Sequence, residues 1–269
     1  MFENIKAVVC DIDGTLSLAG ADPSEYTIQT LEELRNRGIL IALASGRPAD
    51  DVMLKYKKWN MSKQFDFIIG WNGCEVYDDK TKEIYRYNKL KKEWIKEIIE
   101  FMAEFKAAIH MYRPGIFISS DDTDRAWYSA YKNSRTYIVE PDVSAFYSED
   151  NCGIMFRYDL SEDEKIREKI KTLKGKDYIA FNTQVDLLEF SHKDSSKGYA
   201  LKEYCKMYDI ALEDVMAFGD TDNDNEMLKI CNGVCLCDGN PDTIKLCRYV
   251  TDKPCYEDGF ADFVQRNLL

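Results

Sequence analysis

The sequence is poor in histidine, in long apolar runs and in positive charge. Only His110 and His192 occur in its 269 residues, and no Gly-x-Ser-x-Gly segment is present, so a serine hydrolase with a catalytic histidine has little support. No apolar run approaches the ~20 residues of a membrane-spanning helix, and the first residues lack the features of a signal peptide. The 36 lysines and arginines against 48 acids give a net charge of −12, which argues against nucleic acid or an anionic membrane as the main partner.

Cysteine is more abundant, with nine residues, but its spacing is unsuited to zinc. Cys231, Cys235 and Cys237 crowd together and Cys247 follows, yet there is no Cys-x-x-Cys pair and no histidine nearby. Other cysteines, such as Cys10, lie in apolar segments, where unpaired cysteine is commonly buried. We therefore expect reduced thiols and a cytoplasmic protein.

The most informative segment follows the apolar run of residues 5–10. A short, β-branched run that ends near a glycine predicts a buried strand and a tight turn, with Asp11 and Asp13 at the carboxyl end of the strand. Ligands collect at that end of open α/β sheets. Two acids without a basic neighbour are costly there unless a cation or a proton arrives. The segment predicts a divalent-cation site with one acid as a nucleophile, and a simple acidic turn is the alternative.

Helical and strand patterns alternate in the first 80 residues. A helix is predicted over 24–37, with Ser24 as its N-cap, and a strand over 39–44. The same alternation resumes after residue 191, with a predicted helix over 198–208 and a strand over 215–218. Such alternation is typical of a parallel sheet covered by helices on both faces.

The segments between these two parts are more amphipathic and richer in lysine, glutamate and tyrosine. One predicted helix opens with the capping-box pair Ser161 and Glu164. We interpret residues 81–188 as an α+β module inserted into a discontinuous core domain of residues 1–80 and 189–269. The predicted fold class is α/β, with a doubly wound, Rossmann-like parallel-sheet core and an inserted α+β domain.

Polar groups recur where the predicted core strands end or helices begin. They are Asp11 with Asp13, Ser45, Lys197 and the acidic loop that ends at Asp224. Each alone has an ordinary explanation, such as a common turn or a solvated lysine at a helix start. Together and in this order they resemble the haloacid dehalogenase superfamily, and most closely its Cof-type phosphatases with a large α/β (C2-type) cap. The segments that carry the resemblance are Asp11-Ile12-Asp13-Gly14-Thr15-Leu16, Ser45-Gly46-Arg47, Asn72-Gly73, Lys197-Gly198 and Gly219-Asp220-Thr221-Asp222-Asn223-Asp224.

The resemblance covers nearly the whole chain and implies a magnesium-dependent phosphomonoester hydrolase that acts on small phosphorylated metabolites, such as sugar phosphates. Asp11 would form an aspartyl-phosphate, Asp13 would act as general acid and base, and Lys197 would offset the approach of carboxylate and phosphate. Asp13 would bind Mg²⁺ through its main-chain carbonyl, and Asp224 either directly or by supporting the other ligands. The residues implied to hold the phosphate are Ile12, Ser45, Gly46, Lys197 and Asn223, and those implied to hold Mg²⁺ are Asp11, Asp13, Asp220 and Asp224.

Residues beyond the core motifs are candidates for the substrate pocket. Arg47 and Asn72 follow two of the motifs, with surface turn residues as the alternative interpretation. In the inserted module, which would close over the site as the cap, the candidate selectors are Tyr112, Arg113, Glu189 and His192.

Two other functions share the same motifs. A phosphohexose mutase needs a second, arginine-rich phosphate site, whereas the six arginines of residues 81–190 are scattered along the sequence. A non-catalytic phosphometabolite sensor usually lacks a catalytic group, and none is missing here. We expect a small phosphorylated metabolite as partner, no nucleic acid or membrane, and a monomer or weak homodimer.

Overall fold

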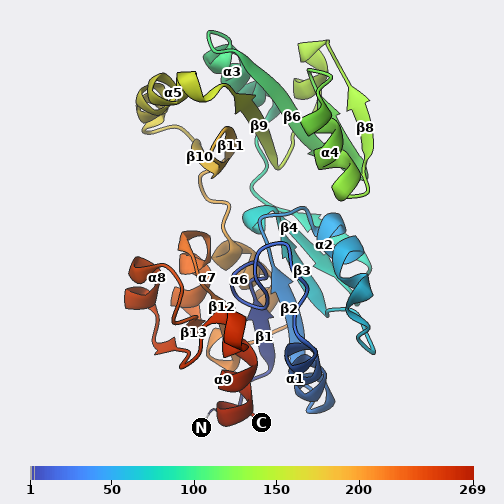
Figure 1. Cartoon of the computed structure of the whole chain (residues 1–269), viewed down its shortest axis with the longest axis vertical. Helices are drawn as coiled ribbons and strands as arrows, with labels where there is room; N and C mark the ends of the chain where they lie inside the picture. The colour runs from blue at the N-terminus through green and yellow to red at the C-terminus, as the bar shows by residue number, and fades with distance from the viewer. Residues whose placement is uncertain (1, 3) are drawn as a thin grey trace. The chain divides into compact units, whose positions relative to one another are not determined.

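The computed structural model describes residue 2 and residues 4–269, which fold into two compact units (Figure 1). The first contains the chain up to Tyr85 together with Ser196–Leu269, and the second is Arg86–Ser195. These divisions come five and seven residues after the predicted ones at 80/81 and 188/189. The reason is strand pairing: β5 (Glu83–Arg86) joins the sheet of the first unit, and β11 (Leu187–His192) belongs wholly to the sheet of the second.

The first unit has an α/β architecture. Its described strands form an eight-stranded sheet in the order β14-β13-β12-β1-β2-β3-β4-β5. Neighbours from β14 to β3 are parallel, and β4 runs antiparallel to β3. Its strands are β1 (Ala7–Cys10), β2 (Leu40–Ala44), β3 (Phe67–Gly70), β4 (Glu75–Asp78), β5, β12 (Val215–Gly219), β13 (Asn232–Cys235) and β14 (Tyr249–Val250). Its helices are α1 (Glu25–Asn36), α2 (Ala49–Tyr56), α6 (Lys197–Met207), α7 (Asn225–Ile230), α8 (Pro241–Leu246) and α9 (Gly259–Asn267), with short 3-10 helices that include η1 (Lys57–Trp59), η2 (Trp71–Gly73) and η7 (Asp222–Asp224).

Helices cover both faces of this sheet. α1, α2 and α9 share one apolar cluster with the sheet, in which Leu31 and Val264 pack with Val8. On the opposite face, the ring of Phe67 in β3 stacks on that of Tyr204 in α6, with centroids 3.7 Å apart. All four residues of β1 are buried, as a strand between two helical layers requires. The predicted doubly wound core is therefore confirmed.

The second unit is an α+β module. Its described strands form a six-stranded sheet in the order β10-β11-β9-β6-β7-β8, antiparallel throughout except for the parallel pair β7–β8. Ile98 of α3 and Ile166 of α5 pack with Phe156 of β9 in one apolar cluster. The strands are β6 (Ala107–Arg113), β7 (Ile116–Ser119), β8 (Thr136–Val139), β9 (Gly153–Tyr158), β10 (Tyr178–Gln184) and β11, and the helices are α3 (Lys92–Met102), α4 (Asp124–Lys132) and α5 (Asp163–Ile170).

Two predicted helix N-termini can be compared with the structure. The hydroxyl of Ser24 accepts the Thr27 amide at 3.0 Å and caps α1, as predicted. The capping box predicted at Ser161 is wrong. Asp159 accepts both the amide and the hydroxyl of Ser161, at 2.9 and 2.7 Å, and so caps a short 3-10 helix, Leu160–Glu162. α5 then begins at Asp163.

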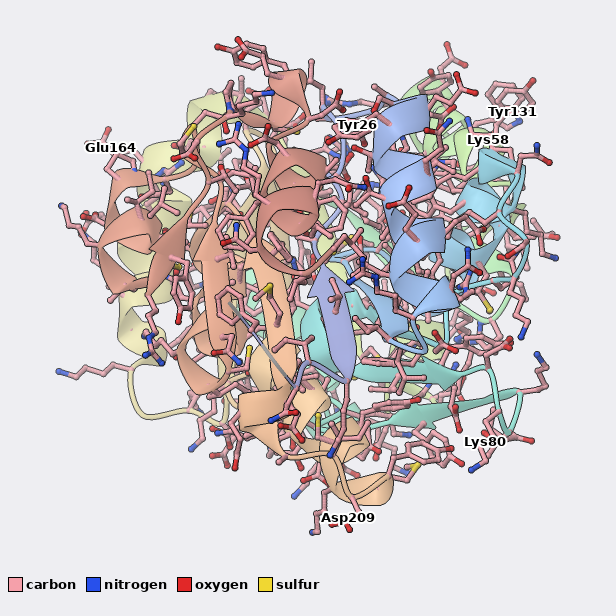
Figure 2. The ribbon with its side chains drawn as sticks, turned by 90° about the horizontal axis from the view of Figure 1, so that it is seen from below. Tyr26, Lys58, Lys80, Tyr131, Glu164 and Asp209 are labelled. Atoms are coloured by element: carbon pink, nitrogen blue, oxygen red, sulfur yellow. The ribbon has the colours of Figure 1, made fainter. Side chains whose placement is uncertain are left out.

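Charged side chains lie on the surface of the first unit. Lys58, Lys80 and Asp209 are exposed, and they extend outward from the ribbon (Figure 2). Among the helices of the described residues, none combines the length and the apolar character needed to cross a membrane.

Candidate active site

Five polar residues of the first unit meet at one edge of its sheet. Asp11 follows β1, Ser45 follows β2 and Asp220 follows β12. Because β1 lies between β2 and β12 and is parallel to both, the three residues reach the same edge. Lys197 begins α6 and Asp224 ends η7, and both extend into this group. The sequence predicted that these residues lie at strand ends, and the structure shows which side chains contact one another.

Lys197 is the centre of the charge arrangement. Its Nζ lies 2.6 Å from Oδ1 of Asp11 and 2.7 Å from Oδ1 of Asp224, and its side chain is 0% exposed. The ordinary explanation of Lys197, a solvated lysine at a helix start, is therefore excluded. Burial lowers the pKa of Lys197, but the two carboxylates outweigh burial and raise it well above the ordinary value. The ammonium is charged at neutral pH.

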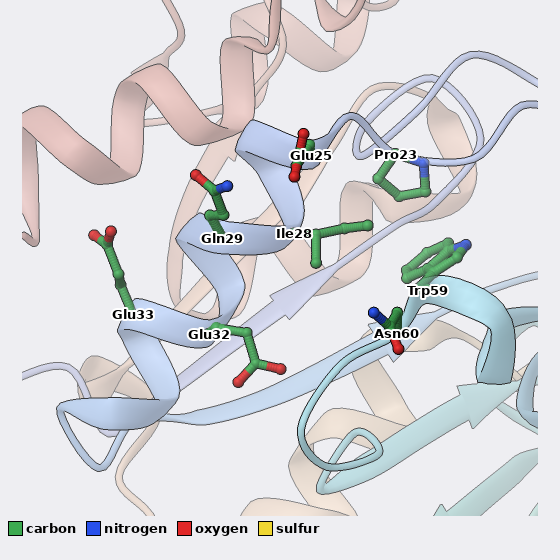
Figure 3. A pocket seen from close by; sticks show the side chains of 8 residues that line it. All are labelled: Pro23, Glu25, Ile28, Gln29, Glu32, Glu33, Trp59 and Asn60. Carbon is green, nitrogen blue, oxygen red and sulfur yellow. The ribbon is translucent and has the colours of Figure 1, made fainter.

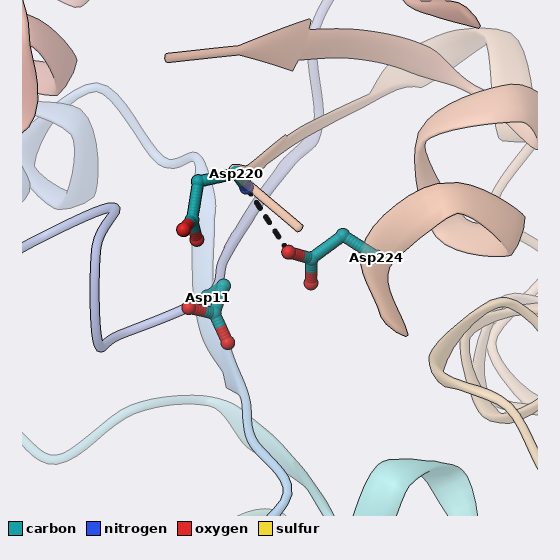
Figure 4. Close-up of side chains that lie close together, drawn as sticks. All are labelled: Asp11, Asp220 and Asp224. Carbon is teal, nitrogen blue, oxygen red and sulfur yellow. Dashed lines mark hydrogen bonds between the residues drawn. The ribbon is translucent and has the colours of Figure 1, made fainter. Parts of the chain in front are cut away.

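Three carboxylates converge beside this ammonium. Asp11, Asp220 and Asp224 each offer one oxygen, and these oxygens lie within 4.8 Å of one another (Figure 4). Burial raises the pKa of Asp11 to about 8 against the opposing effect of Lys197. Burial, reinforced by Asp224, raises the pKa of Asp220 to about 6. When ionised, the three acids and one lysine carry a net charge of −2, which a divalent cation would balance.

Two glycines permit the close approach of these loops. Gly14 has a φ of +99°, and a Cβ there would lie 2.4 Å from Oδ2 of Asp220. A Cβ on Gly219 would lie 2.5 Å from the carboxyl carbon of Asp224. Only glycine fits either position, because any Cβ would displace the carboxylate. The donors are all oxygens of carboxylates, which suit a hard cation such as Mg²⁺, so the residues fit the implied metal.

Asp224 also organises the loop after β12. Its Oδ2 accepts the amides of Asp220 and Thr221, at 3.0 and 3.2 Å, while its Oδ1 accepts from Lys197. Thr221 and Asp224 form a reciprocal capping box at the start of η7. The fully buried carboxylate of Asp224 thus positions both the Asp220 loop and Lys197. The hydroxyl of Thr15, a motif residue for which no role was predicted, donates to Oδ1 of Asp220 at 3.0 Å.

Asp13 lies beside the three acids but has different partners. Nη2 of Arg47 is 3.2 Å from its Oδ2, and the amide of Gly20 donates to its Oδ1 at 3.2 Å. Burial raises the pKa of Asp13, but Arg47 and Gly20 together bring it below the ordinary value. The side chain of Asp13 is not part of the three-acid group, and binding of Mg²⁺ by its carbonyl stays a prediction.

The predicted phosphate-binding residues gather around the loop after β2. The amide of Arg47 donates to the Ser45 hydroxyl at 3.2 Å, and the Asn72 amide donates to the Ser45 carbonyl at 3.1 Å. The Asn223 side chain donates to Oδ1 of Asn72 at 3.2 Å, and a Cβ on Gly46 would lie 3.3 Å from that same oxygen. Arg47 and Asn72 therefore lie at the Ser45 loop, and their place in the substrate pocket stays a prediction. Ile12 is buried, and phosphate binding by its amide stays a prediction.

A further buried acid, Glu75, binds the start of the helix that follows the Ser45 loop. Oε2 of Glu75, in β4, accepts the amide of Ala49 at 3.0 Å, at the first residue of α2. The carboxylate therefore lies at the positive end of the helix that follows the Ser45 loop. Sequence reasoning missed Glu75, because its partner is distant in sequence and no local pattern marks it.

The candidate selectors of the second unit have local partners. Nδ1 of His192 accepts the amide of Asp194 at 3.1 Å, and Arg113 donates to the carbonyl of Ala145 at 2.8 Å. Two of the arginines that are scattered in sequence come together, since Arg125 and Arg157 both pair with Asp186. Their shared carboxylate already offsets part of the positive charge that a mutase would need. Substrate selection by these residues stays a prediction.

A separate hollow of about 670 Å³ lies between α1 and η1 (Figure 3). It contains three glutamates, and its described lining has no lysine or arginine, so it does not suit an anionic substrate. The lining residues are Pro23, Glu25, Ile28, Gln29, Glu32, Glu33, Trp59 and Asn60.

Comparison with known proteins gives a consistent result. The family model described as haloacid dehalogenase-like hydrolase matches residues 8–264. The chain is 26% identical over 262 residues to the HMP-PP phosphatase of Yersinia enterocolitica, covering 96% of this chain and 93% of that protein. It is 23% identical over 267 residues to the 5-amino-6-(5-phospho-D-ribitylamino)uracil phosphatase YitU of Bacillus subtilis, covering 96% of each. The crystal structure of TM0651 from Thermotoga maritima has the same fold, with a TM-score of 0.87 at 22% identity over 98% of both chains.

Proposed function

The chain belongs to the haloacid dehalogenase-like hydrolases, and from this premise we propose that it is a magnesium-dependent phosphatase that hydrolyses monoesters of small phosphorylated metabolites. The observation that carries the proposal is the position of Lys197 between Asp11 and Asp224, beside Asp220. One charged lysine and three acids at a strand edge suit the binding of a phosphoryl group together with a divalent cation.

Asp11 is the proposed nucleophile. Lys197 contacts its Oδ1, which leaves Oδ2 as the oxygen for attack on phosphorus. The new O–P bond forms as the ester O–P bond breaks, and the leaving alkoxide takes a proton from Asp13. Asp13 can hold that proton only in the substrate complex, where the negative charge of the phosphate raises its pKa above the lowered value of the free chain. Asp13, now ionised, accepts a proton from a water molecule, which attacks the phosphoryl group and releases phosphate and the Asp11 carboxylate.

The other residues of the site offset the negative charge of the phosphate or keep the reacting groups in place. Lys197 offsets the repulsion between the carboxylate of Asp11 and the phosphate, while Asp224 holds Lys197 and the loop of Asp220 in place. Ser45 and Asn223 donate to the phosphate oxygens. Mg²⁺, bound by Asp11, Asp220 and the Asp13 carbonyl, would neutralise phosphate charge and keep Asp11 ionised.

The names of two relatives and the charge of the chain support a proposed substrate class. Two relatives of nearly equal length are named as phosphatases of HMP-PP and of a phosphorylated ribitylaminouracil. We propose a compound of comparable chemistry for this chain: a small metabolite with a terminal phosphate. A chain with a net charge of −12 would need a local cluster of positive groups or a metal to bind such an anion.

The test is hydrolysis of p-nitrophenyl phosphate with Mg²⁺ and after treatment with a chelator. We expect turnover by the wild type with Mg²⁺ and at least about 100-fold lower turnover after the metal is removed. With Mg²⁺ present, Asp13→Ala should be at least about 100-fold slower than the wild type, since general acid–base catalysis contributes on that scale. The exposed Asp242→Asn serves as a matched control with unchanged turnover. A folded wild type that is inactive with Mg²⁺ would contradict the proposal and favour a mutase or a sensor.

Arg47 offers a more specific prediction. Replacing it by Ala removes the guanidinium from beside Asp13, so the pKa of Asp13 should rise. The basic limb of the kcat profile against pH, which reports the general acid in the enzyme–substrate complex, should move up by about one pH unit. Arg47→Lys keeps the charge and should restore most of the original profile. An unchanged basic limb in Arg47→Ala would show that Arg47 does not act on Asp13.

The raised pKa values of Asp11 and Asp220 predict a link between pH and metal binding. Both folded-state values, about 8 and about 6, exceed the unfolded value, so the folded chain binds more protons above about pH 4. Without metal, the free energy of unfolding should therefore fall as pH rises towards 8, by up to about 1.4 kcal/mol per pH unit for each proton.

Mg²⁺ replaces those protons, so its stabilising effect should grow with pH. We expect the increase in Tm caused by Mg²⁺ to be larger at about pH 8 than at about pH 5.5. Thermal unfolding with and without Mg²⁺ measures this directly. Asp220→Asn should reduce the effect, and an increase in Tm that is independent of pH would refute the proton competition.

A further inference from the structure

The segment between Asp13 and α1 is a loop that few contacts hold in place. In the described chain no helix or strand lies between β1 and α1. Residues 18–22 are exposed, so packing against the core does not fix them. The loop nevertheless reaches the site, because the amide of Gly20 donates to Oδ1 of Asp13 at 3.2 Å. The position of the Asp13 carboxylate therefore depends on how this exposed loop is held.

The near end of the loop is held by the turn that carries Asp13. The amide of Ser17 donates to the Ile12 carbonyl at 3.1 Å, and the amide of Gly14 donates to the Ser17 carbonyl at 2.7 Å. The buried hydroxyl of Ser17 donates to the carbonyl of Ala21 at 3.2 Å. These bonds fix the turn, whereas the residues after it depend also on where the far end of the loop is held.

The far end of the loop is held by an indole. Nε1 of Trp59 donates to Oδ1 of Asp22 at 3.2 Å, and Nζ of Lys58 lies 2.9 Å from Oδ2 of the same carboxylate. The Lys58 and Asp22 side chains are 59% and 47% exposed, and an exposed ion pair of this kind contributes little. The Trp59 side chain is only 2% exposed, and a buried indole N–H usually keeps a hydrogen-bond partner. The bond from the indole is therefore the firmer of the two.

Trp59 is packed into the core of the first unit. Its ring lies edge-on to those of Tyr56 and Phe65, with centroids 4.1 and 5.9 Å away. Trp59 ends η1, which continues α2, and Arg47 lies two residues before the start of α2 (Figure 3 shows Trp59). Both oxygens of the Asp13 carboxylate are thus held from the ends of one helical segment. Arg47 contacts Oδ2 directly, and Trp59 acts on Oδ1 through the loop.

We propose that the Asp22–Trp59 hydrogen bond positions the Asp13 carboxylate for its chemical steps, which makes Asp22 and Trp59 positioning residues. With Asp22 held, the short segment from Ser17 to Asp22 has little freedom, and the Gly20 amide stays within reach of Oδ1. Without this bond, the exposed loop moves away and the Asp13 side chain is free to adopt other rotamers. A misplacement of about 1 Å can reduce a rate on the order of 100-fold. The effect on turnover rests on the proposed function.

The first test detects the role of the bond without any assay of activity. Amide hydrogen exchange at Gly20 is measured by NMR on the full-length, metal-free protein. We expect exchange to be at least about threefold faster in Asp22→Ala, which removes the acceptor at an exposed position, and in Trp59→Phe, which keeps a ring without the N–H. Lys58→Gln is the matched control, because it removes only the ion pair, and it should leave the exchange unchanged. Unchanged exchange in Asp22→Ala, or equal acceleration in Lys58→Gln, would overturn the proposal.

Turnover of p-nitrophenyl phosphate with Mg²⁺ then shows whether the loop acts on Asp13. Asp22→Ala should lower kcat by at least about tenfold and leave KM within about twofold, because Asp13 is proposed to act in the chemical steps. Asp22→Asn keeps an oxygen that accepts from the indole, so it should restore kcat to within about twofold of the wild type. An Asp22→Asn variant as slow as Asp22→Ala would overturn the role of the indole.

A double variant shows whether the effect passes through Asp13. In Asp13→Ala/Asp22→Ala the group to be positioned is absent, so the second change should cost no further turnover beyond Asp13→Ala alone. A further loss of the size seen for Asp22→Ala in the wild type would overturn the proposal. An inactive wild type would contradict the proposed function but leave the exchange experiment unaffected, so failure of either proposal can be recognised separately.

Discussion

Asp11→Asn is expected to reduce kcat for phosphate ester hydrolysis by about 10⁴-fold or more. The amide keeps the size of the side chain but lacks the carboxylate oxygen that attacks phosphorus. Because burial already raises the pKa of Asp11, a neutral group at this position should be well tolerated by the fold. Lys197 retains its contact with Asp224 in the variant. Single-turnover and steady-state assays with p-nitrophenyl phosphate measure the loss.

The variant separates catalysis from stability. The free energy of unfolding of Asp11→Asn without metal should be equal to or greater than that of the wild type, particularly near pH 8, where the wild-type carboxyl is partly ionised in the folded chain and fully ionised in the unfolded chain. Asp242→Asn, on the exposed face of α8, should change neither turnover nor stability measurably. If Asp11→Asn keeps a substantial fraction of wild-type kcat, Asp11 is not the nucleophile, and a direct attack by water becomes the better mechanism.

The strand-end residues could be predicted because local patterns determine them. Asp11, Ser45 and Asp220 each follow a short apolar run, and parallel strands bring their carboxyl ends to one edge whatever the details of packing. The same logic predicted the helix that begins near Lys197, one residue from its observed start. The sequence was therefore informative for residues whose position depends only on where a parallel strand ends.

Elements without a clear apolar period were missed. Among the described side chains of α4, only those of the small residues Ala126 and Ala130 are buried, while Trp127 and Tyr131 are half or more exposed. The hydrophobic pattern therefore does not mark the helical face that packs on the sheet. The Arg47–Asp13 pair and the Glu75–Ala49 bond join residues distant in sequence, so their existence depends on how loops approach in three dimensions.

Substitution of Lys197 should cost substantial stability. Lys197→Met keeps an unbranched side chain of similar length but leaves the carboxylates of Asp11 and Asp224 without their common counter-charge. Loss of one partner from a buried ion pair typically costs about 3–5 kcal/mol, and we expect a decrease of that size in the free energy of unfolding without metal. Lys202→Met, on the exposed side of the same helix, should change it by less than about 0.5 kcal/mol. Urea unfolding measures both.

A double-mutant cycle shows whether charge is the cause. In Lys197→Met/Asp11→Asn one of the two stranded carboxylates is replaced by a neutral amide, so part of the loss should be recovered, by about 1–3 kcal/mol relative to the sum of the single changes. A purely steric role for Lys197 predicts simple additivity instead. Lys197→Met also removes the positive charge that lowers the pKa of Asp11, so this pKa should rise above its wild-type value of about 8 in the single variant. Additivity would show that Lys197 supports the fold by packing alone, and it would remove the electrostatic argument for its role beside the phosphate.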